Sequence, residues 1–147
     1  MRPAVFVDRD GTINHDSGYI HDPKDLVLYD DTVALLKSYV SKGYLIIVLT
    51  NQSGINRGYF TEEECNKFNS AVKAELEKHG IGIDAFYICP HTPSEGCNCR
   101  KPNTGMAEKA IKEFDIDTKK SIVIGDRDDM DGELARRLGI NYLILER

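Results

Sequence analysis

Two aspartates stand two residues apart near the start of the chain, directly after a short apolar run at residues 5–7. The motif reads Asp8-Arg9-Asp10-Gly11-Thr12. A carboxylate at the end of a buried strand is held rigidly and partly shielded from water, so Asp8 can attack as a nucleophile while Asp10 transfers a proton. The same residues also describe an Asp-Gly turn that closes a β-hairpin. On this motif alone, the two interpretations are about equally supported.

Polar side chains also end two later apolar runs. Thr50 follows residues 45–49, and Asp126 follows residues 122–124 after one glycine. The working site of an open α/β sheet lies at the carboxyl ends of its parallel strands, so we expect Asp8, Thr50 and Asp126 to converge there. Loops are polar in general, which explains any one of these residues more easily than all three.

A convergence of carboxylates predicts a metal ion. Asp8, Asp10 and Asp126 would repel one another unless a cation neutralised them, and oxygen ligands suit Mg²⁺, which commonly bridges carboxylates and a phosphate. Asp126 is nearest to its strand and is the expected ligand from that segment. For a second support of the metal, the residues leave Asp131 and Asp129 open, with Asp131 favoured.

A phosphoryl group beside that metal needs hydrogen-bond donors around its oxygens. Thr50, Asn51 and Lys101 can supply them. Arg100 and Arg127 add cations suited to bidentate contacts with a phosphate or a sugar. For each of these arginines, a solvated position at the surface is almost equally expected.

Three of the four cysteines lie close to a histidine in the sequence. One histidine and three thiolates can close a tetrahedral Zn²⁺ site, which has no open position and is therefore structural. The expected task of this loop, at about residues 89–99, is to fix Arg100 and Lys101 beside the reacting phosphate. Reduced cysteines in a mobile loop are the weaker alternative. The predicted ligands are Cys89, His91, Cys97 and Cys99.

Five apolar runs recur along the chain, and each is nearly continuous rather than alternating. Such runs predict strands buried on both faces, as in a parallel sheet covered by helices. The segments between them have helical spacing, and one begins with a capping box at Thr61 and Glu64. This alternation predicts an α/β fold with a doubly wound, mostly parallel sheet. The expected strands are residues 5–7, 45–49, 85–88, 122–124 and 142–145, and the expected helices lie within 33–43, 61–80, 106–114 and 134–139.

Size and charge narrow the classes of partner. At 147 residues the chain fits one domain, residues 1–147, and its net charge of −5 opposes a general nucleic-acid surface. No apolar run approaches a membrane span, and residues 1–7 leave no room for the apolar segment of a signal peptide. We therefore expect a cytoplasmic protein, without disulfides and with a monomer favoured, whose partner is a small phosphorylated metabolite rather than nucleic acid or a membrane.

Four motifs follow one another along the chain: Asp8-x-Asp10-Gly11-Thr12, Thr50, Lys101 and Gly125-Asp126-x4-Asp131. In type and order they resemble those of the haloacid dehalogenase superfamily of phosphohydrolases. The resemblance implies a Rossmann-like core in which Asp8 forms an aspartyl phosphate and Asp10 acts as general acid and then as base. It also implies that Thr50 and Lys101 hold the phosphoryl group. Mg²⁺ would be bound by the Asp8 carboxylate, the Asp10 backbone carbonyl and Asp126.

Residues 8–14, residues 50–55, the cysteine loop and Arg100-Lys101-Pro102 look like one branch of that superfamily. This branch contains D-glycero-D-manno-heptose 1,7-bisphosphate phosphatases and histidinol-phosphate phosphatases, and residues 14–19 and 101–106 are more similar to the heptose enzymes. No inserted cap domain is expected, because residues 13–29 and 51–60 are too short for one. The substrate contacts that the resemblance implies are Asp16, Asn51, Ser53, Arg100 and Arg127.

Two alternatives remain beside a sugar phosphatase. Within the enzyme class, histidinol phosphate is the second substrate. From a different class, a phosphoacceptor receiver domain is also a five-strand α/β unit that groups acids, a Thr and a Lys around Mg²⁺. A receiver takes its phosphate on the third strand, where this chain has Cys89, so strand order separates the two.

Overall fold

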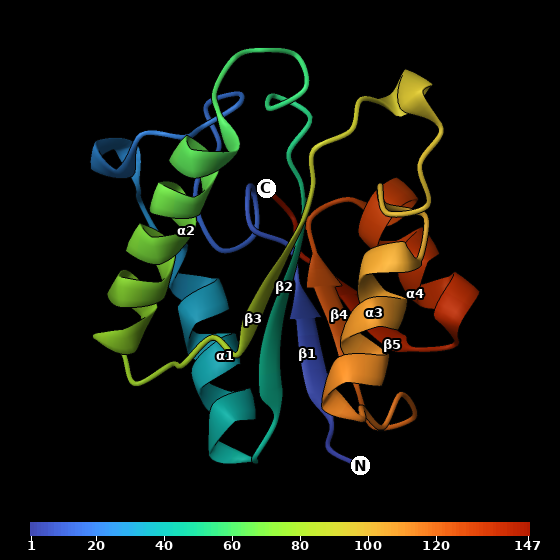
Figure 1. The fold of residues 1–147 in the computed structure, drawn as a ribbon. Helices are drawn as coiled ribbons and strands as arrows, with labels where there is room; N and C mark the ends of the chain where they lie inside the picture. Colours follow the sequence, from blue (N-terminus) through green and yellow to red (C-terminus); the bar gives the residue numbers. More distant parts are fainter.

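The computed structural model describes residues 1–147 and contains one sheet of five strands in the order β3-β2-β1-β4-β5 (Figure 1). Every neighbouring pair of strands is parallel. The predicted doubly wound α/β sheet is therefore confirmed. The strands are β1 (Ala4–Val7), β2 (Leu45–Asn51), β3 (Ala85–Cys89), β4 (Ile122–Gly125) and β5 (Asn141–Ile144).

Helices cover both faces of this sheet, with α1 and α2 on one side and α3 and α4 on the other (Figure 1). Successive side chains of a strand point to opposite faces. In β1, Val5 and Val7 pack in the core under α1 and α2, whereas Ala4 and Phe6 pack under α3 and α4. The helices are α1 (Asp30–Ser41), α2 (Glu62–Glu77), α3 (Gly105–Phe114) and α4 (Glu133–Leu138), with 3₁₀ turns η1 (Pro23–Asp25) and η2 (Pro93–Glu95) and a π-helical turn η3 (Asp128–Gly132).

Burial on both faces is confirmed for the central strands and wrong for β5. All of β1 and most of β2 are buried. Strand β5 lies at one edge of the sheet, and its Tyr142 and Leu143 are 41% and 37% exposed. Strand β3, at the other edge, is mostly half-buried. An apolar run does not reveal whether a strand has a neighbour on both sides, so the edge position was not visible in the sequence.

Helix α2 begins where the capping box predicts. The Thr61 hydroxyl accepts a hydrogen bond from the Glu64 N–H at 3.1 Å, and the Glu64 carboxylate accepts one from the Thr61 N–H at 3.1 Å. Both bonds satisfy donors that have no partner within the helix. The helix then buries Phe68, Val72 and Leu76 against the sheet.

The strand order also excludes the receiver alternative. Doubly wound domains of the receiver type order their strands 2-1-3-4-5, whereas here β1 is central between β2 and β4. The acid pair accordingly follows the middle strand of the sheet. The segments after β1 and after β2 hold no inserted domain, as expected, and η1 is the only helical turn in them. None of the helices combines the length and the apolar character needed to cross a bilayer.

Candidate active site and metal centres

A polar cavity of about 300 Å³ lies at the carboxyl edge of the sheet. The carboxyl ends of β1, β2 and β4 bring Asp8, Thr50 and Asp126 into its wall, as their positions after apolar runs predict. All of the predicted catalytic and substrate-binding residues line this one cavity. They are Asp8, Asp10, Asp16, Thr50, Asn51, Ser53, Arg100, Lys101, Asp126 and Arg127, joined by Gly18, Tyr19, Gln52, Met130 and Asp131.

The buried ammonium of Lys101 lies at the centre of the site. Its Nζ donates to Asp8 Oδ1 at 2.8 Å, to Asp131 Oδ1 at 2.9 Å and to the Leu49 carbonyl at 2.7 Å. These three bonds use all three of its hydrogens. Burial acts to lower the pKa of Lys101, but the charges of Asp131 and Asp8 outweigh it and raise the pKa, so the side chain stays cationic.

For Asp8, burial has a larger effect on the pKa than the neighbouring cation. Burial raises the pKa of Asp8, the charge of Lys101 lowers it, and the nearby Asp131 raises it again, with a net upward shift. A nucleophilic carboxylate must be ionised, and a further cation beside Asp8 would favour that form. The charges of the protein alone therefore do not offset the effect of burial on Asp8.

A carboxylate cluster supplies the place for such a cation. Oxygen atoms of Asp8, Asp126 and Asp131 all lie within 4.8 Å of one another. The Thr12 hydroxyl lies between two of them, 3.4 Å from Asp8 Oδ2 and 3.3 Å from Asp126 Oδ1. Hard oxygen donors in this number fit Mg²⁺. The donor set therefore agrees with the metal expected from the sequence.

Asp131, not Asp129, is the acid that supports this cluster. The Asp131 side chain is buried and is paired with Lys101. Asp129 is exposed and pairs with Arg127 at 2.7 Å. The remaining acid of the segment, Asp128, pairs with Arg136 at 2.9 Å. The π-helical turn η3 turns Asp131 inward and leaves the other two outside.

The Asp10 carboxylate does not belong to the grouped carboxylates, which leaves only its backbone carbonyl as the ligand that the family resemblance implies. Four N–H donors hold that carboxylate, and each of its two oxygens accepts two of these hydrogen bonds. Asp131 takes its place among the grouped carboxylates. The donors are Arg9 Nε at 2.8 Å, Arg9 Nη2 at 3.0 Å, Asn14 Nδ2 at 3.1 Å and Gln52 Nε2 at 2.9 Å.

Arg9 is the most informative residue that the sequence did not single out. Its side chain is fully buried, stacks 4.5 Å from the Phe68 ring centroid and donates to Asn69 Oδ1 at 2.9 Å and to the Ile20 carbonyl at 3.2 Å. It therefore ties Asp10 to helix α2. An arginine between two aspartates is usually a solvated charge, so nothing in one sequence marks it as buried.

Two amide side chains at the end of β2 hold other residues of the site in place. Asn51 grips the backbone of Lys101, because its Oδ1 accepts from the Lys101 N–H at 2.9 Å and its Nδ2 donates to the Lys101 carbonyl at 3.2 Å. Gln52, which the sequence did not single out, donates to Thr50 Oγ1 at 2.8 Å as well as to Asp10. The Thr50 hydroxyl hydrogen remains available to a ligand.

The remaining predicted contacts lie around the mouth of the cavity. Asp16 accepts the Gly18 N–H at 2.9 Å, and Ser53 Oγ accepts from Arg57 Nε at 3.1 Å. Arg100 is half-buried and donates to the His91 carbonyl at 3.5 Å. The guanidinium of Arg100 is therefore held by the cysteine loop, through His91.

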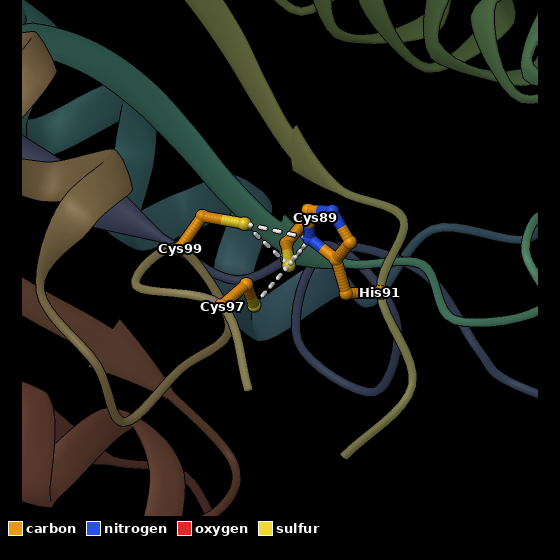
Figure 2. Close-up of side chains that lie close together, drawn as sticks. All are labelled: Cys89, His91, Cys97 and Cys99. Carbon is orange, nitrogen blue, oxygen red and sulfur yellow. Dashed lines mark hydrogen bonds between the residues drawn. The ribbon is translucent and has the colours of Figure 1, made fainter. Parts of the chain in front are cut away.

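The cysteine loop gathers its four predicted metal ligands (Figure 2). His91 Nδ1 lies 3.1 Å from Cys99 Sγ and 3.4 Å from Cys89 Sγ. Cys89 Sγ lies 2.7 Å from Cys99 Sγ and 3.6 Å from Cys97 Sγ. These separations exceed the 2.05 Å or so of a disulfide bond, and all cysteines are free. Three sulfurs and one ring nitrogen fit a structural Zn²⁺ site.

Hydrogen bonds connect Cys97 of that cluster to the two sides of the active-site lysine, at Arg100 and Asn103. The Arg100 N–H donates to Cys97 Sγ at 3.3 Å, and Asn103 Nδ2 donates to the Cys97 carbonyl at 2.9 Å. At the first residue of α3, a side chain on Gly105 would meet the Asn98 carbonyl at 2.6 Å. The cysteine loop is therefore packed closely against the start of α3, and Arg100 and Lys101 directly follow its last ligand, Cys99.

Comparison with known proteins agrees with this geometry. A family described as polynucleotide kinase 3 phosphatase matches residues 4–142. The probable D-glycero-D-manno-heptose-1,7-bisphosphate 7-phosphatase of Thermoplasma acidophilum is 55% identical over 142 residues, which cover 97% of this chain and 89% of that protein. This chain belongs to the heptose-bisphosphate phosphatase family. It is thus a phosphatase with the haloacid dehalogenase core.

Other members of the heptose-bisphosphate phosphatase family extend the likeness. The D-glycero-alpha-D-manno-heptose-1,7-bisphosphate 7-phosphatase of Campylobacter jejuni is 43% identical over 144 residues, covering 97% of this chain and 83% of that protein. The crystal structure of the heptose bisphosphate phosphatase from B. bronchiseptica, complexed with magnesium and phosphate, matches with a TM-score of 0.87 at 28% identity. That match covers 98% of this chain and 80% of the other.

Proposed function

We propose that this chain removes one phosphate from D-glycero-D-manno-heptose 1,7-bisphosphate by Mg²⁺-dependent hydrolysis through an aspartyl phosphate on Asp8. The observation that carries the proposal is the buried contact of Lys101 with Asp8 and Asp131, beside Asp126, at one end of a polar cavity. The names of the relatives support the sugar.

Mg²⁺ is assigned to the carboxylates of Asp8 and Asp126 and to the backbone carbonyl of Asp10. When bound, it supplies positive charge beside the nucleophile and the phosphoryl oxygens. Asp131 supports this site by holding Lys101 at 2.9 Å. The grouping of the three carboxylates and the magnesium in the relative's crystal structure support the assignment.

The proposed reaction has two displacements at phosphorus. An oxygen of Asp8 bonds to phosphorus, the bond from phosphorus to the sugar oxygen breaks, and Asp10 gives that oxygen a proton. Asp10 then accepts a proton from water, whose oxygen attacks phosphorus and releases Asp8 and inorganic phosphate. The four N–H donors around Asp10 fix the position of its carboxyl group at the cavity wall for both proton transfers.

Donors around the cavity are assigned to the substrate. Thr50 and Lys101 hold the transferred phosphoryl group, and the bond from Gln52 leaves the Thr50 hydroxyl hydrogen free for it. Removing one such donor typically lowers kcat by two to three orders of magnitude, about 3 kcal/mol. The contacts assigned to the rest of the substrate are Asp16, Asn51, Ser53, Arg100 and Arg127.

Zn²⁺ is assigned to Cys89, His91, Cys97 and Cys99, as a structural ion within a single domain formed by residues 1–147. The close packing of four ligand atoms supports it. Free thiols persist in reducing compartments, which supports a cytoplasmic protein. We favour a monomer, with a small phosphorylated sugar as its partner.

Phosphate release from a substrate panel tests the proposal. The panel holds both anomers of the heptose bisphosphate, other sugar phosphates, histidinol phosphate and an oligonucleotide with a 3′ phosphate, the last because of the matched family. The heptose bisphosphates should have the highest kcat/KM, and Asp8→Asn should remove turnover. A preference for histidinol phosphate or the oligonucleotide would refute the substrate, and full activity of Asp8→Asn would refute the mechanism.

A further inference from the structure

The side chain of Arg147, which follows β5, reaches back to the catalytic loop after β1. Its Nε donates to the Gly11 carbonyl at 2.8 Å, and its Nη2 donates to the Thr12 carbonyl at 3.1 Å. Figure 1 marks the C-terminus among the loops at this edge of the sheet. The two carbonyls belong to the motif that begins with Asp8, so Arg147 touches the backbone of the catalytic loop itself.

The guanidinium of Arg147 is fixed on every side. It pairs with both Asp31 oxygens, at 2.7 and 3.1 Å, and lies 3.7 Å from the Tyr29 ring centroid. Its Nη2 also donates to Thr32 Oγ1 at 3.1 Å. Only 16% of the side chain is exposed. Five planar N–H groups that all find acceptors form a rigid fork, unlike a solvated arginine at a chain end.

Thr12 connects Arg147 to the carboxylate cluster. The Thr32 hydroxyl donates to the Thr12 carbonyl at 2.6 Å, so Thr12 is held by two donors on its backbone. Its own hydroxyl lies between Asp8 and Asp126. The segment before Arg147 is anchored to the same cluster, because the Leu145 N–H donates to the Gly125 carbonyl at 2.8 Å, one residue before Asp126.

We propose that Arg147 is a positioning residue, which fixes Thr12 and thereby the separation of Asp8 and Asp126 at the metal site. The segment 145–147 ties together the ends of β1 and β4, the two strands that deliver those carboxylates. The inference rests on the proposed Mg²⁺ site. Partners that orient metal ligands from outside typically change metal affinity or activity by 10- to 100-fold.

Mg²⁺ binding by the full chain tests this role without relying on turnover. Calorimetric titration with Mg²⁺ compares the wild type with Arg147→Ala, Arg147→Lys and Arg2→Ala. Arg2 serves as the control because it is exposed and its side chain donates to the Gly43 carbonyl. Both residues precede their strands, β1 and β2, and so lie at the opposite edge of the sheet from the site. We expect Mg²⁺ binding about tenfold weaker in Arg147→Ala, an intermediate value in Arg147→Lys and an unchanged value in Arg2→Ala.

Added guanidinium separates positioning from general stability. Millimolar guanidinium can occupy the space between Tyr29 and Asp31 in Arg147→Ala and should restore most of the lost Mg²⁺ affinity. As a denaturant, it would only worsen a general loss of stability. Unchanged Mg²⁺ affinity in both Arg147 variants, or a loss that guanidinium does not repair, overturns the proposal.

The test remains decisive if one variant does not fold or if the wild type lacks the proposed activity. If Arg147→Ala does not fold, Arg147→Lys, which keeps the charge but lacks the fork, provides the same comparison with the wild type. If the wild type hydrolyses none of the sugar phosphates, the proposed function fails, and the Mg²⁺ titrations still decide the role of Arg147.

Discussion

Replacing Lys101 by Met separates its effect on catalysis from its effect on stability. The change keeps most of the aliphatic length but removes the ammonium that pairs with Asp8 at 2.8 Å and with Asp131 at 2.9 Å. Loss of a donor to the transferred phosphoryl group costs about 3 kcal/mol, so kcat should fall roughly a hundredfold. Breaking a buried ion pair costs about 3–5 kcal/mol of unfolding free energy, so the midpoint of denaturant unfolding in EDTA should also fall.

A second substitution distinguishes the two effects. Asp131→Asn removes one of the carboxylates that Lys101→Met leaves without a partner. The double variant should therefore recover part of the lost unfolding free energy, relative to the sum of the two single variants, but none of the lost kcat. Lys109→Met, at an exposed lysine of α3, is the matched control and should change neither quantity. The reasoning is refuted if Lys101→Met keeps kcat within about threefold of the wild type, or if the two substitutions are simply additive in stability.

Three further predictions concern other parts of the site. Cys97→Ser should lower the zinc content of purified protein, measured by elemental analysis, and lower kcat through Lys101; wild-type protein without zinc would contradict the ligand assignment. Gly11→Ala should weaken Mg²⁺ binding and reduce the free energy of unfolding by more than about 1 kcal/mol. The reason is that Gly11 has a φ of 82° and that an added Cβ would meet the Asp126 carboxylate. An unchanged unfolding midpoint and an unchanged Mg²⁺ affinity would contradict this. The Arg147 hydrogen bonds lower the pKa of Asp31 below its usual 3.8. This pair therefore contributes stability above the pKa of Asp31 in the unfolded chain, and that stability is lost as the pH falls through the pKa in the folded protein. The Tm difference between wild type and Arg147→Ala should be constant from about pH 7 to 5 and shrink below about pH 4, and a Tm difference that grows in acid would contradict this.

Strand ends and metal ligands could be predicted because their chemistry is local. Asp8, Thr50 and Asp126 each follow an apolar run, and parallel strands bring such ends to one edge. The cysteine loop was equally predictable, since its four ligands lie close together in the sequence, between Cys89 and Cys99. The predicted catalytic and substrate-binding residues accordingly line one cavity, and the four cysteine-loop ligands form a separate cluster.

What the sequence did not reveal depends on contacts between distant segments. The buried Arg9 binds Asn69 of α2, 60 residues away, and Arg147 binds Gly11, 136 residues away. Asn51 was expected as a donor to phosphate, and its two hydrogen bonds to the Lys101 backbone were not foreseen. A residue type shows which hydrogen bonds it can form, whereas the partner that it finds depends on the packed fold.

The grip of Asn51 on Lys101 has a consequence for how this family can diversify. The lysine is docked on the end of β2 by two amide bonds to its backbone and one ammonium bond to Leu49, so its place is set independently of the path the chain takes from His91 to Cys97. Insertions or deletions in that stretch, none of whose residues lines the polar cavity, can therefore change the loop without displacing Lys101. Chains of this family can therefore differ in the length of this loop while the active-site lysine keeps its place at the end of β2.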